Sequence, residues 1–242
     1  MRDRVEIMGV PIDKGNLNDA RERFIRLLEE ESCSTIITPN TEIVMEAQKD
    51  HKLLNVIKNA DLVIPDGIGL IYASKIKRKG LTDRVTGVDL MYKVLEYCDR
   101  NSKKIYIFGG KPGVSEKATE NILKKFPNIN VVGNRSGYFK LEEEQEIIEN
   151  INKSEPDILF TGLGAPKQEK WMDQYKSQLK VRVAMGVGGS VDIWAGTAQR
   201  APEIYQKLGL EWLYRLKKEP WRYKRMMMLP KFMIKVLLSK EI

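Results

Sequence analysis

Short apolar runs rich in β-branched residues recur along the first 190 residues of this chain, and helical patterns separate them. Such alternation is typical of a parallel sheet in which a helix follows each strand. Several runs are apolar without a strict two-residue period, as expected for strands that helices cover on both faces. The sequence therefore predicts a doubly wound, mostly parallel, Rossmann-like α/β sheet, with strands at residues 5–10, 35–38, 62–64, 104–108, 130–132, 158–161 and 181–185.

Length and composition favour one large domain followed by a short extension. The chain has 242 residues, and its charged fraction of 31% is that of a folded protein with a well-charged surface. The first apolar run is too short for a signal peptide, and no stretch approaches the roughly 20 apolar residues of a membrane-spanning helix. We expect a main domain at 1–195, a basic helical appendage at 196–242, and a cytoplasmic location.

Histidine and cysteine usage excludes several enzyme classes. His51 is the only histidine, so neither a histidine-based catalytic triad nor a multi-histidine zinc site can be assembled. Cys33 and Cys98 lie far apart inside apolar segments. They are expected to be buried thiols in a reducing cytosol rather than a disulfide or a metal site.

Positive charge is concentrated at the C-terminal end. Residues 200–242 contain 11 Lys or Arg against 4 Glu, whereas the whole chain has a net charge of +8. This asymmetry indicates an anionic partner, either nucleic acid or phospholipid, and a solvated helical face is the alternative. Interleaved aromatic and basic side chains favour a membrane surface: Trp212, Tyr214, Trp221 and Tyr223 among Arg215, Arg222, Lys224 and Arg225.

Two prolines, Pro220 and Pro230, are expected to break the appendage into short helices. The last of these, at about 231–239, is long enough to lie on a bilayer but too short to cross it.

In a sheet of this kind a ligand binds beyond the carboxyl ends of the strands, so the residues after each strand are the candidate site. Asn40 follows the second expected strand and Asp66 the third, where Gly67 leaves room for a ligand. For both polar residues, capping of the following helix is the alternative interpretation.

Glycine-rich loops follow three later strands. Residues 109–113 precede an expected helix whose N-terminus suits a phosphate group, although the pattern is neither a Walker motif nor GxGxxG. Residues 162–169 place Gln168 in the first turn of a helix that faces the cleft. The glycines of 186–192 allow a ligand close to the backbone, or else close packing of a helix on the sheet.

Six motifs occur in order along nearly the whole chain, and together they are far more specific than any one of them. The ordered set resembles the WecG/TagA/CpsF family of bacterial glycosyltransferases, whose best-known members make the linkage unit of wall teichoic acid or enterobacterial common antigen. The runs at 200–202 and 212–215 are also similar to the family. The six motifs are TPN (38–40), PDG (65–67), RVTGVDL (84–90), FGG (108–110), GLGAPKQE (162–169) and VGGSVDIWAG (187–196).

The resemblance implies transfer of N-acetylmannosamine from its UDP donor to the 4-hydroxyl of N-acetylglucosamine on undecaprenyl diphosphate, with inversion at the anomeric carbon. Relatives in the family transfer different hexoses, so another UDP-hexose stays open as the donor. An enzyme with this lipid-linked acceptor is expected to work at the inner face of the cytoplasmic membrane, which residues 196–242 would contact.

Inversion requires a base that takes the proton from the attacking hydroxyl, and a carboxylate can fill that role. Asp66 is the expected base, and the resemblance places Thr38, Asn40 and Gln168 around it. Asp89 is the reserve candidate, although its position suits a residue that begins a helix.

No Asp-x-Asp pair, the usual holder of a metal on a donor diphosphate, occurs in the sequence. We therefore expect catalysis without a metal or another cofactor. Helix N-termini and Arg84, together with Arg215, Arg222 or Arg225 from an appendage that closes over the cleft, would meet the charge of the departing diphosphate. The other expected substrate-binding residues are Gly109, Gly110, Lys111, Gly164, Gly188, Gly189 and Asp192.

Two other classes of protein compete with this interpretation. A nucleic-acid-binding or RNA-modifying protein would use the basic aromatic tail on phosphates, but the positive charge is confined to that tail, so we expect no nucleic acid partner. A nucleotide-sugar epimerase or dehydrogenase would bind NAD. A homo-oligomer is compatible with the sequence.

Overall fold

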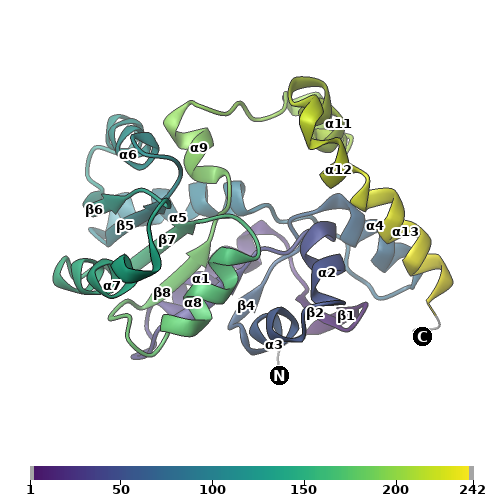
Figure 1. The fold of residues 1–242 in the computed structure, drawn as a ribbon, viewed down its shortest axis with the longest axis horizontal. Coiled ribbons are helices and arrows are strands. Elements are labelled where there is room, and N and C mark those ends of the chain that lie inside the picture. Colours follow the sequence, from purple (N-terminus) through teal and green to yellow (C-terminus); the bar gives the residue numbers. More distant parts are fainter. Residues whose placement is uncertain (1–2, 240–242) are drawn as a thin grey trace.

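The computed structural model describes residues 3–239, and for Arg222 it describes the backbone alone. Its centre is a six-stranded sheet in which every pair of neighbours is parallel, in the order β4-β3-β8-β7-β5-β6 (Figure 1). This confirms the predicted doubly wound α/β fold. The strands are β3 (Ser34–Ile37), β4 (Leu62–Val63), β5 (Lys104–Gly109), β6 (Asn130–Arg135), β7 (Ile158–Gly162) and β8 (Val183–Gly186).

The first predicted strand is wrong, because residues 5–10 do not join the parallel sheet. They form an antiparallel hairpin of β1 (Arg4–Ile7) and β2 (Val10–Asp13), which is a separate two-stranded sheet. Met8 and Gly9 make the turn with φ of 53° and 72°, and two positive φ values define the type I′ turn that fits a hairpin. Because Met8, rather than glycine or asparagine, occupies the first of these positions, the turn could not be recognised from the sequence.

Helices cover both faces of the sheet, which explains the apolar strands. One face packs on α1, α5, α6 and α9 through a core that includes Ile105, Ile107 and Phe160. Over β5, β7 and β8 the other face packs on α7 and α8, with Phe108 and Trp171 in ring contact. The helices of the main body are α1 (Leu17–Leu27), α2 (Thr41–Ala47), α3 (His51–Asn59), α4 (Ile68–Ile76), α5 (Gly87–Asn101), α6 (Val114–Lys125), α7 (Glu144–Lys153), α8 (Lys167–Tyr175) and α9 (Ser190–Ala195), with a 3₁₀ turn at Leu141–Glu143.

A buried aspartate fixes the hairpin to the sheet. Asp13 accepts hydrogen bonds from Arg4 and Arg23 and from the backbone N–H of Val63 on β4. Burial alone would raise the pKa of Asp13, but these three donors hold it below its usual value. The charge is therefore satisfied inside the protein and positions the hairpin beside α3 and β4.

The C-terminal segment crosses from the C-terminal end of α9 to the N-terminal half of the molecule, as the green to yellow ribbon in Figure 1 shows. It contains α10 (Glu203–Lys207), α11 (Glu211–Lys218), a 3₁₀ turn (Pro220–Arg222), α12 (Tyr223–Met226) and α13 (Met228–Leu238). The expected break at Pro230 is wrong: Pro230 lies in the first turn of α13, where a proline removes no helical hydrogen bond. Within residues 3–239, no helix has both the length and the apolar character that a membrane crossing demands.

Helix α13 is anchored in a hydrophobic core that it shares with the hairpin, α2, α3 and α4. Phe232 is fully buried and Val236 is 2% exposed. Gly69 on α4 permits this close contact, since a Cβ there would lie 2.6 Å from Leu229 Cδ1. The appendage therefore packs on residues from the first third of the chain.

Candidate active site

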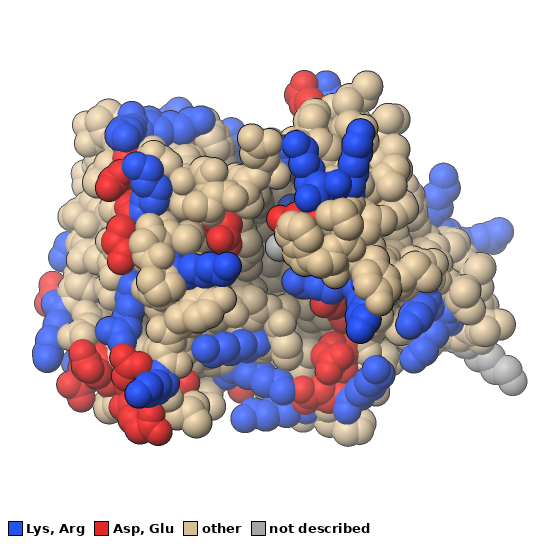
Figure 2. All heavy atoms as spheres, turned by 45° about the horizontal axis from the view of Figure 1, so that its top comes forward, with Lys and Arg blue, Asp and Glu red and all other residues tan. Residues whose placement is uncertain are grey.

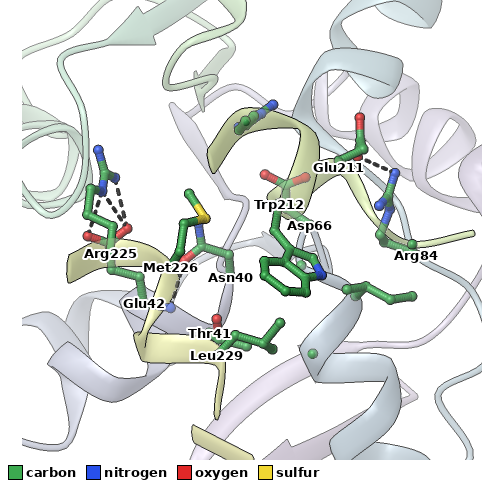
Figure 3. A pocket seen from close by; sticks show the side chains of 15 residues that line it. Asn40, Thr41, Glu42, Asp66, Arg84, Glu211, Trp212, Arg225, Met226 and Leu229 are labelled. Atoms are coloured by element: carbon green, nitrogen blue, oxygen red, sulfur yellow. Dashed lines mark hydrogen bonds and ion pairs between the residues drawn. The ribbon is translucent and has the colours of Figure 1, made fainter. Parts of the chain in front are cut away.

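A cleft lies between the loops that follow β3 and β4 and the helices of the C-terminal segment (Figure 3). It contains about 850 Å³ of empty space, part of it open to solvent. Figure 2 shows this face hollowed between two halves of the molecule, with Lys and Arg on both sides of the hollow. The lining residues are Asn40, Thr41, Glu42, Asp66, Gly67, Ile68, Gly69, Arg84, Gly209, Glu211, Trp212, Arg215, Arg225, Met226 and Leu229.

Asp66 lies in this cleft, in the loop that follows β4. Its backbone N–H donates to the carbonyl of Pro39 at 3.1 Å, which ties the loop after β4 to the loop after β3. Helix α4 begins with Gly67 as its N-cap and without a side-chain cap, so Asp66 does not serve as a capping residue. Its carboxylate is left for another role.

The surroundings of Asp66 make its carboxyl group a stronger base than an exposed aspartate. Burial raises its pKa to about 6, although the charges of Arg215 and Arg84 and a hydrogen bond from the Gly87 backbone act in the opposite direction. Glu211 adds to the upward shift. A carboxylate with a pKa near 6 is ionised at neutral pH and still accepts a proton readily.

Asn40 combines the two roles that the sequence left open. Its side-chain oxygen caps α2 by accepting from the backbone N–H groups of Glu42 and Ile43, at 2.9 and 3.1 Å, and the residue also lines the cleft. Gly67 packs against it, since a Cβ on Gly67 would lie 3.1 Å from Asn40 Cβ. The cap therefore fixes Asn40 beside Asp66.

Thr38 lies beneath the cleft rather than in its wall. The side chain is buried, and its Oγ1 donates to the carbonyl of Gly186 at the end of β8. It also packs on Gly87, whose Cβ would lie 3.4 Å from Thr38 Oγ1. Thr38 thus joins the end of β3 to the end of β8 and to the start of α5.

Three of the predicted arginines reach the cleft, namely Arg84, Arg215 and Arg225. Arg84 Nη2 lies 2.6 Å from Glu211 Oε2, and Arg225 forms a two-point pair with Glu42, with Nη2 to Oε2 at 2.8 Å; Figure 3 shows both pairs. The side chain of Arg222, the fourth predicted arginine, is outside the described part of the chain. Cations from the main body and from the appendage therefore meet in one cavity.

Gln168, in the first turn of α8, is buried and is not among the residues that line the cleft. Its Oε1 accepts from the backbone N–H of Gly188 at 3.1 Å, and its Nε2 donates to Glu169 at 2.8 Å. The Glu169 carboxyl is also buried, and burial raises its pKa. These contacts show that Gln168 shapes the loop between β8 and α9.

The glycines of the predicted loops fall into two groups. Gly109 is held by packing, because a Cβ there would lie 2.5 Å from the carbonyl oxygen of Gly162. Gly164, Gly188 and Gly189, in contrast, have open space where a Cβ would be. Gly109 therefore allows close packing of neighbouring strands. Gly164, Gly188 and Gly189 leave room for a ligand at the same edge of the sheet as Asp66.

The loop after β5 folds onto a neighbouring loop. Gly110 adopts a φ of 73°, and its carbonyl accepts from the Gly137 N–H at 2.8 Å. Lys111 is exposed beyond it, and Asp192 is half-buried in the first turn of α9. Both side chains lie outside the lining of the cleft that contains Asp66.

Asp89, the reserve candidate for the base, is held in a network of its own. Arg200 donates two hydrogen bonds to its carboxylate at 2.6 and 2.7 Å, and Thr86 donates a third at 2.6 Å. Burial would raise the pKa of Asp89, but these donors hold it below its usual value. The carboxylate positions Arg200 and is poorly suited to take a proton.

Several cleft residues were not predicted from the sequence. Glu42 and Glu211 carried no motif signal, since isolated glutamates on helices are common on protein surfaces. Trp212 was assigned to a membrane interface on its aromatic character, whereas the structure places it in the cleft wall. The proximity of Glu211 and Trp212 to Asp66 depends on how the C-terminal segment folds back.

Comparison with known proteins agrees with this architecture. The model of the family described as Glycosyl transferase WecG/TagA/CpsF matches residues 5–241. The chain belongs to the WecG/TagA/CpsF family of glycosyltransferases.

Curated relatives carry a more specific name. A protein of Bacillus spizizenii is 35% identical over 87% of this chain and 81% of its own length, and one of Bacillus subtilis is 33% identical over 97% and 91%. A protein of Staphylococcus aureus is 34% identical over 98% and 94%. Each is named N-acetylglucosaminyldiphosphoundecaprenol N-acetyl-beta-D-mannosaminyltransferase.

Proposed function

We propose that this glycosyltransferase moves N-acetylmannosamine from UDP-N-acetylmannosamine to the 4-hydroxyl of N-acetylglucosamine on undecaprenyl diphosphate, with inversion, in synthesis of the wall teichoic acid linkage unit. The names of relatives that match nearly the whole chain support the sugar and the acceptor. The observation that carries the proposal is Asp66, a half-buried carboxylate that lines the cleft together with Arg84 and Arg215.

Asp66 would act as the general base. The acceptor oxygen attacks the anomeric carbon from the face opposite UDP, and its proton passes to the Asp66 carboxylate. The bond between the anomeric carbon and the diphosphate oxygen breaks, and its electron pair leaves with UDP. One displacement with one base gives inversion, and a pKa of about 6 suits this proton transfer.

The arginines of the cleft would stabilise the departing diphosphate. Arg84, Arg215 and Arg225 come from both walls, and a guanidinium group matches phosphate oxygens with two parallel hydrogen bonds. The donor nucleotide would bind next to these arginines, against the open backbone at Gly164, Gly188 and Gly189. The other expected substrate-binding residues lie at the same edge of the sheet: Gly109, Gly110, Lys111 and Asp192.

Transfer without a metal is part of this proposal, because arginines would carry the charge that a metal carries elsewhere. Excess EDTA should leave the transfer rate within about twofold of its original value, since no step needs a divalent cation. The measurement is the rate of UDP release before and after chelation. A complete loss that Mg²⁺ or Mn²⁺ restores would contradict this mechanism.

The test of the proposed function is an assay of UDP release with a short-chain lipid diphosphate acceptor and a panel of UDP-sugars. We expect turnover with UDP-N-acetylmannosamine to exceed turnover with the other hexosamines, and NMR of the product to show the inverted linkage to the 4-hydroxyl. If only a different UDP-hexose were turned over, the protein would still be a glycosyltransferase, but the proposed donor sugar would be wrong.

A further inference from the structure

Glu211 connects the C-terminal segment to the loop that precedes α5. Its Oε2 lies 2.6 Å from Arg84 Nη2, and its Oε1 lies 3.6 Å from Arg200 Nε. The side chains of Glu211 and Arg84 are only 13% and 15% exposed, so solvent and salt screen this pair weakly. As the first residue of α11, Glu211 holds the start of the helix that carries Trp212 into the cleft.

The loop that carries Arg84 also encloses Asp66. The N–H of Val85 donates to the carbonyl of Pro65 at 3.0 Å, and the backbone of Gly87 donates to the Asp66 carboxylate. Val85 and Gly87, which make these hydrogen bonds, lie one and three residues after Arg84, so the backbone at Arg84 is tied to the backbone at Asp66. A displacement of Arg84 would therefore also move the backbone groups that surround the Asp66 carboxylate.

Arg200 extends the network on the far side of Glu211. It holds Asp89 through two hydrogen bonds, and Asp89 accepts a third from Thr86 at the start of α5. Positive and negative groups thus alternate from Asp66 through Arg84, Glu211 and Arg200 to Asp89. Alternation of this kind is what allows several charges to be buried together.

We propose that Glu211 is a positioning residue that latches α11 over the cleft: it holds Arg84 in place, with Arg200 behind it, and so fixes the distance between the two walls. The kinetic consequences rest on the proposed function, whereas the latch is a property of the protein without substrate. A guanidinium group has five N–H donors, so the contact of Arg84 with Glu211 leaves others for a diphosphate.

The charge of Glu211 also acts on Asp66. The charged groups that face Asp66 are Arg84 from the loop before α5, and Arg215 and Glu211 from α11. A glutamine at 211 keeps an oxygen that accepts from Arg84 but lacks the negative charge. Asp66 should then lose its proton at lower pH, because Glu211 contributes to its raised pKa.

The experiment compares wild type, Glu211→Gln, Glu211→Ala and a matched control, Glu203→Gln. Glu203 is an 80% exposed acid of the same segment that pairs with Lys207. In Glu211→Gln, the acidic limb of the pH profile of kcat/KM should move to lower pH, so that the rate relative to wild type rises as pH falls. Glu211→Ala should lose more than tenfold in kcat/KM, and glutamine should restore part of it.

Two measurements test the latch without turnover. Hydrogen exchange of residues 211–218 should become faster in Glu211→Ala and stay unchanged in Glu203→Gln. Titration of ¹³C-labelled aspartate carboxyls, with Asp66→Asn to assign the signal, should show the downward shift in Glu211→Gln.

Identical acidic limbs, identical Asp66 titrations and unchanged exchange in the Glu211 variants would overturn the proposal. A protein that transfers no hexosamine yet shows the exchange and titration changes would overturn the proposed function and leave the latch established.

Discussion

At the scale of single residues, two aspartates of this protein show how surroundings decide chemistry. Asp89 is surrounded by donors from Arg200 and Thr86 and has a pKa below the usual value. Asp66 is half-buried with fewer direct donors, and loss of solvent around it raises its pKa to about 6. Of these two carboxylates, only Asp66 is suited to take a proton from a sugar hydroxyl at neutral pH.

Asp66→Asn should lower kcat by on the order of 100-fold or more, because an amide cannot accept the hydroxyl proton. UDP binding should change little, since the arginines remain. In wild type, kcat/KM should fall as pH drops through about 6, where the Asp66 carboxyl gains a proton. Steady-state kinetics and a UDP titration measure both effects; near-normal turnover in the variant would remove Asp66 from the base role.

Gly189→Ala tests whether the open loop after β8 receives the donor. Nothing lies within 4 Å of a Cβ at this position, so the melting temperature should be unchanged while KM for the UDP-sugar rises several-fold. The matched control is Gly186→Ala, whose Cβ would lie 2.8 Å from Gln168 Nε2 and should lower the melting temperature instead. An unaltered KM in Gly189→Ala would place the donor elsewhere.

At the scale of elements, the C-terminal helices are part of the fold as well as part of the cleft. Helix α13 buries Phe232 and Val236 against α2 and α4, and α11 supplies Trp212 and Arg215 to the cavity. The same segment therefore stabilises the N-terminal half and completes the site.

Phe232→Ala should reduce the free energy of unfolding by about 3 kcal/mol, because it leaves a cavity in a core that the rest of the chain cannot easily close. Leu237→Ala, on the same helix but 62% exposed, should change it little. Chemical denaturation of both variants provides the measurement. Equal stability of the two would mean that α13 does not contribute to the folded core in solution.

The six sheet strands could be predicted because each is an apolar run bounded by turn residues. Asp66 could be predicted as a cleft residue because a polar residue that follows an expected strand can be recognised from the sequence alone. The hairpin was missed because Met8 occupies a turn position that glycine or asparagine usually fills. Glu211 and Trp212 were missed as cleft residues because their approach to Asp66 depends on the docking of Phe232, a long-range contact without a local pattern.

At the scale of the whole molecule, most of the exposed large apolar side chains of residues 3–239 lie in the C-terminal segment. Trp221 is 73% exposed, and Ile234, Leu237 and Leu238 project from the side of α13 away from its buried residues. Lysines and arginines lie among them. We propose that this surface lies on the anionic inner face of the cytoplasmic membrane, next to the lipid-linked acceptor.

The combined variant Ile234→Ser, Leu237→Ser and Leu238→Ser should bind anionic liposomes at least tenfold more weakly, because each change removes apolar area that a bilayer would bury. Its stability should be close to that of wild type, since all three side chains are exposed. Leu141→Ser, which changes an exposed leucine outside the segment, is the control. Liposome co-sedimentation measures the binding; equal binding of variant and wild type would exclude this surface as the membrane contact.

The two walls of the cleft come from distant parts of the chain, and this sets an order of events during synthesis. The sheet is complete once β8 ends at Gly186, and Asp66 is then already at its strand end. The opposite wall, from Gly209 to Leu229, leaves the ribosome later. A nascent chain that has left the ribosome as far as α9 thus has every strand of the sheet but lacks the enclosed cleft, and activity should arise only when the final helices dock.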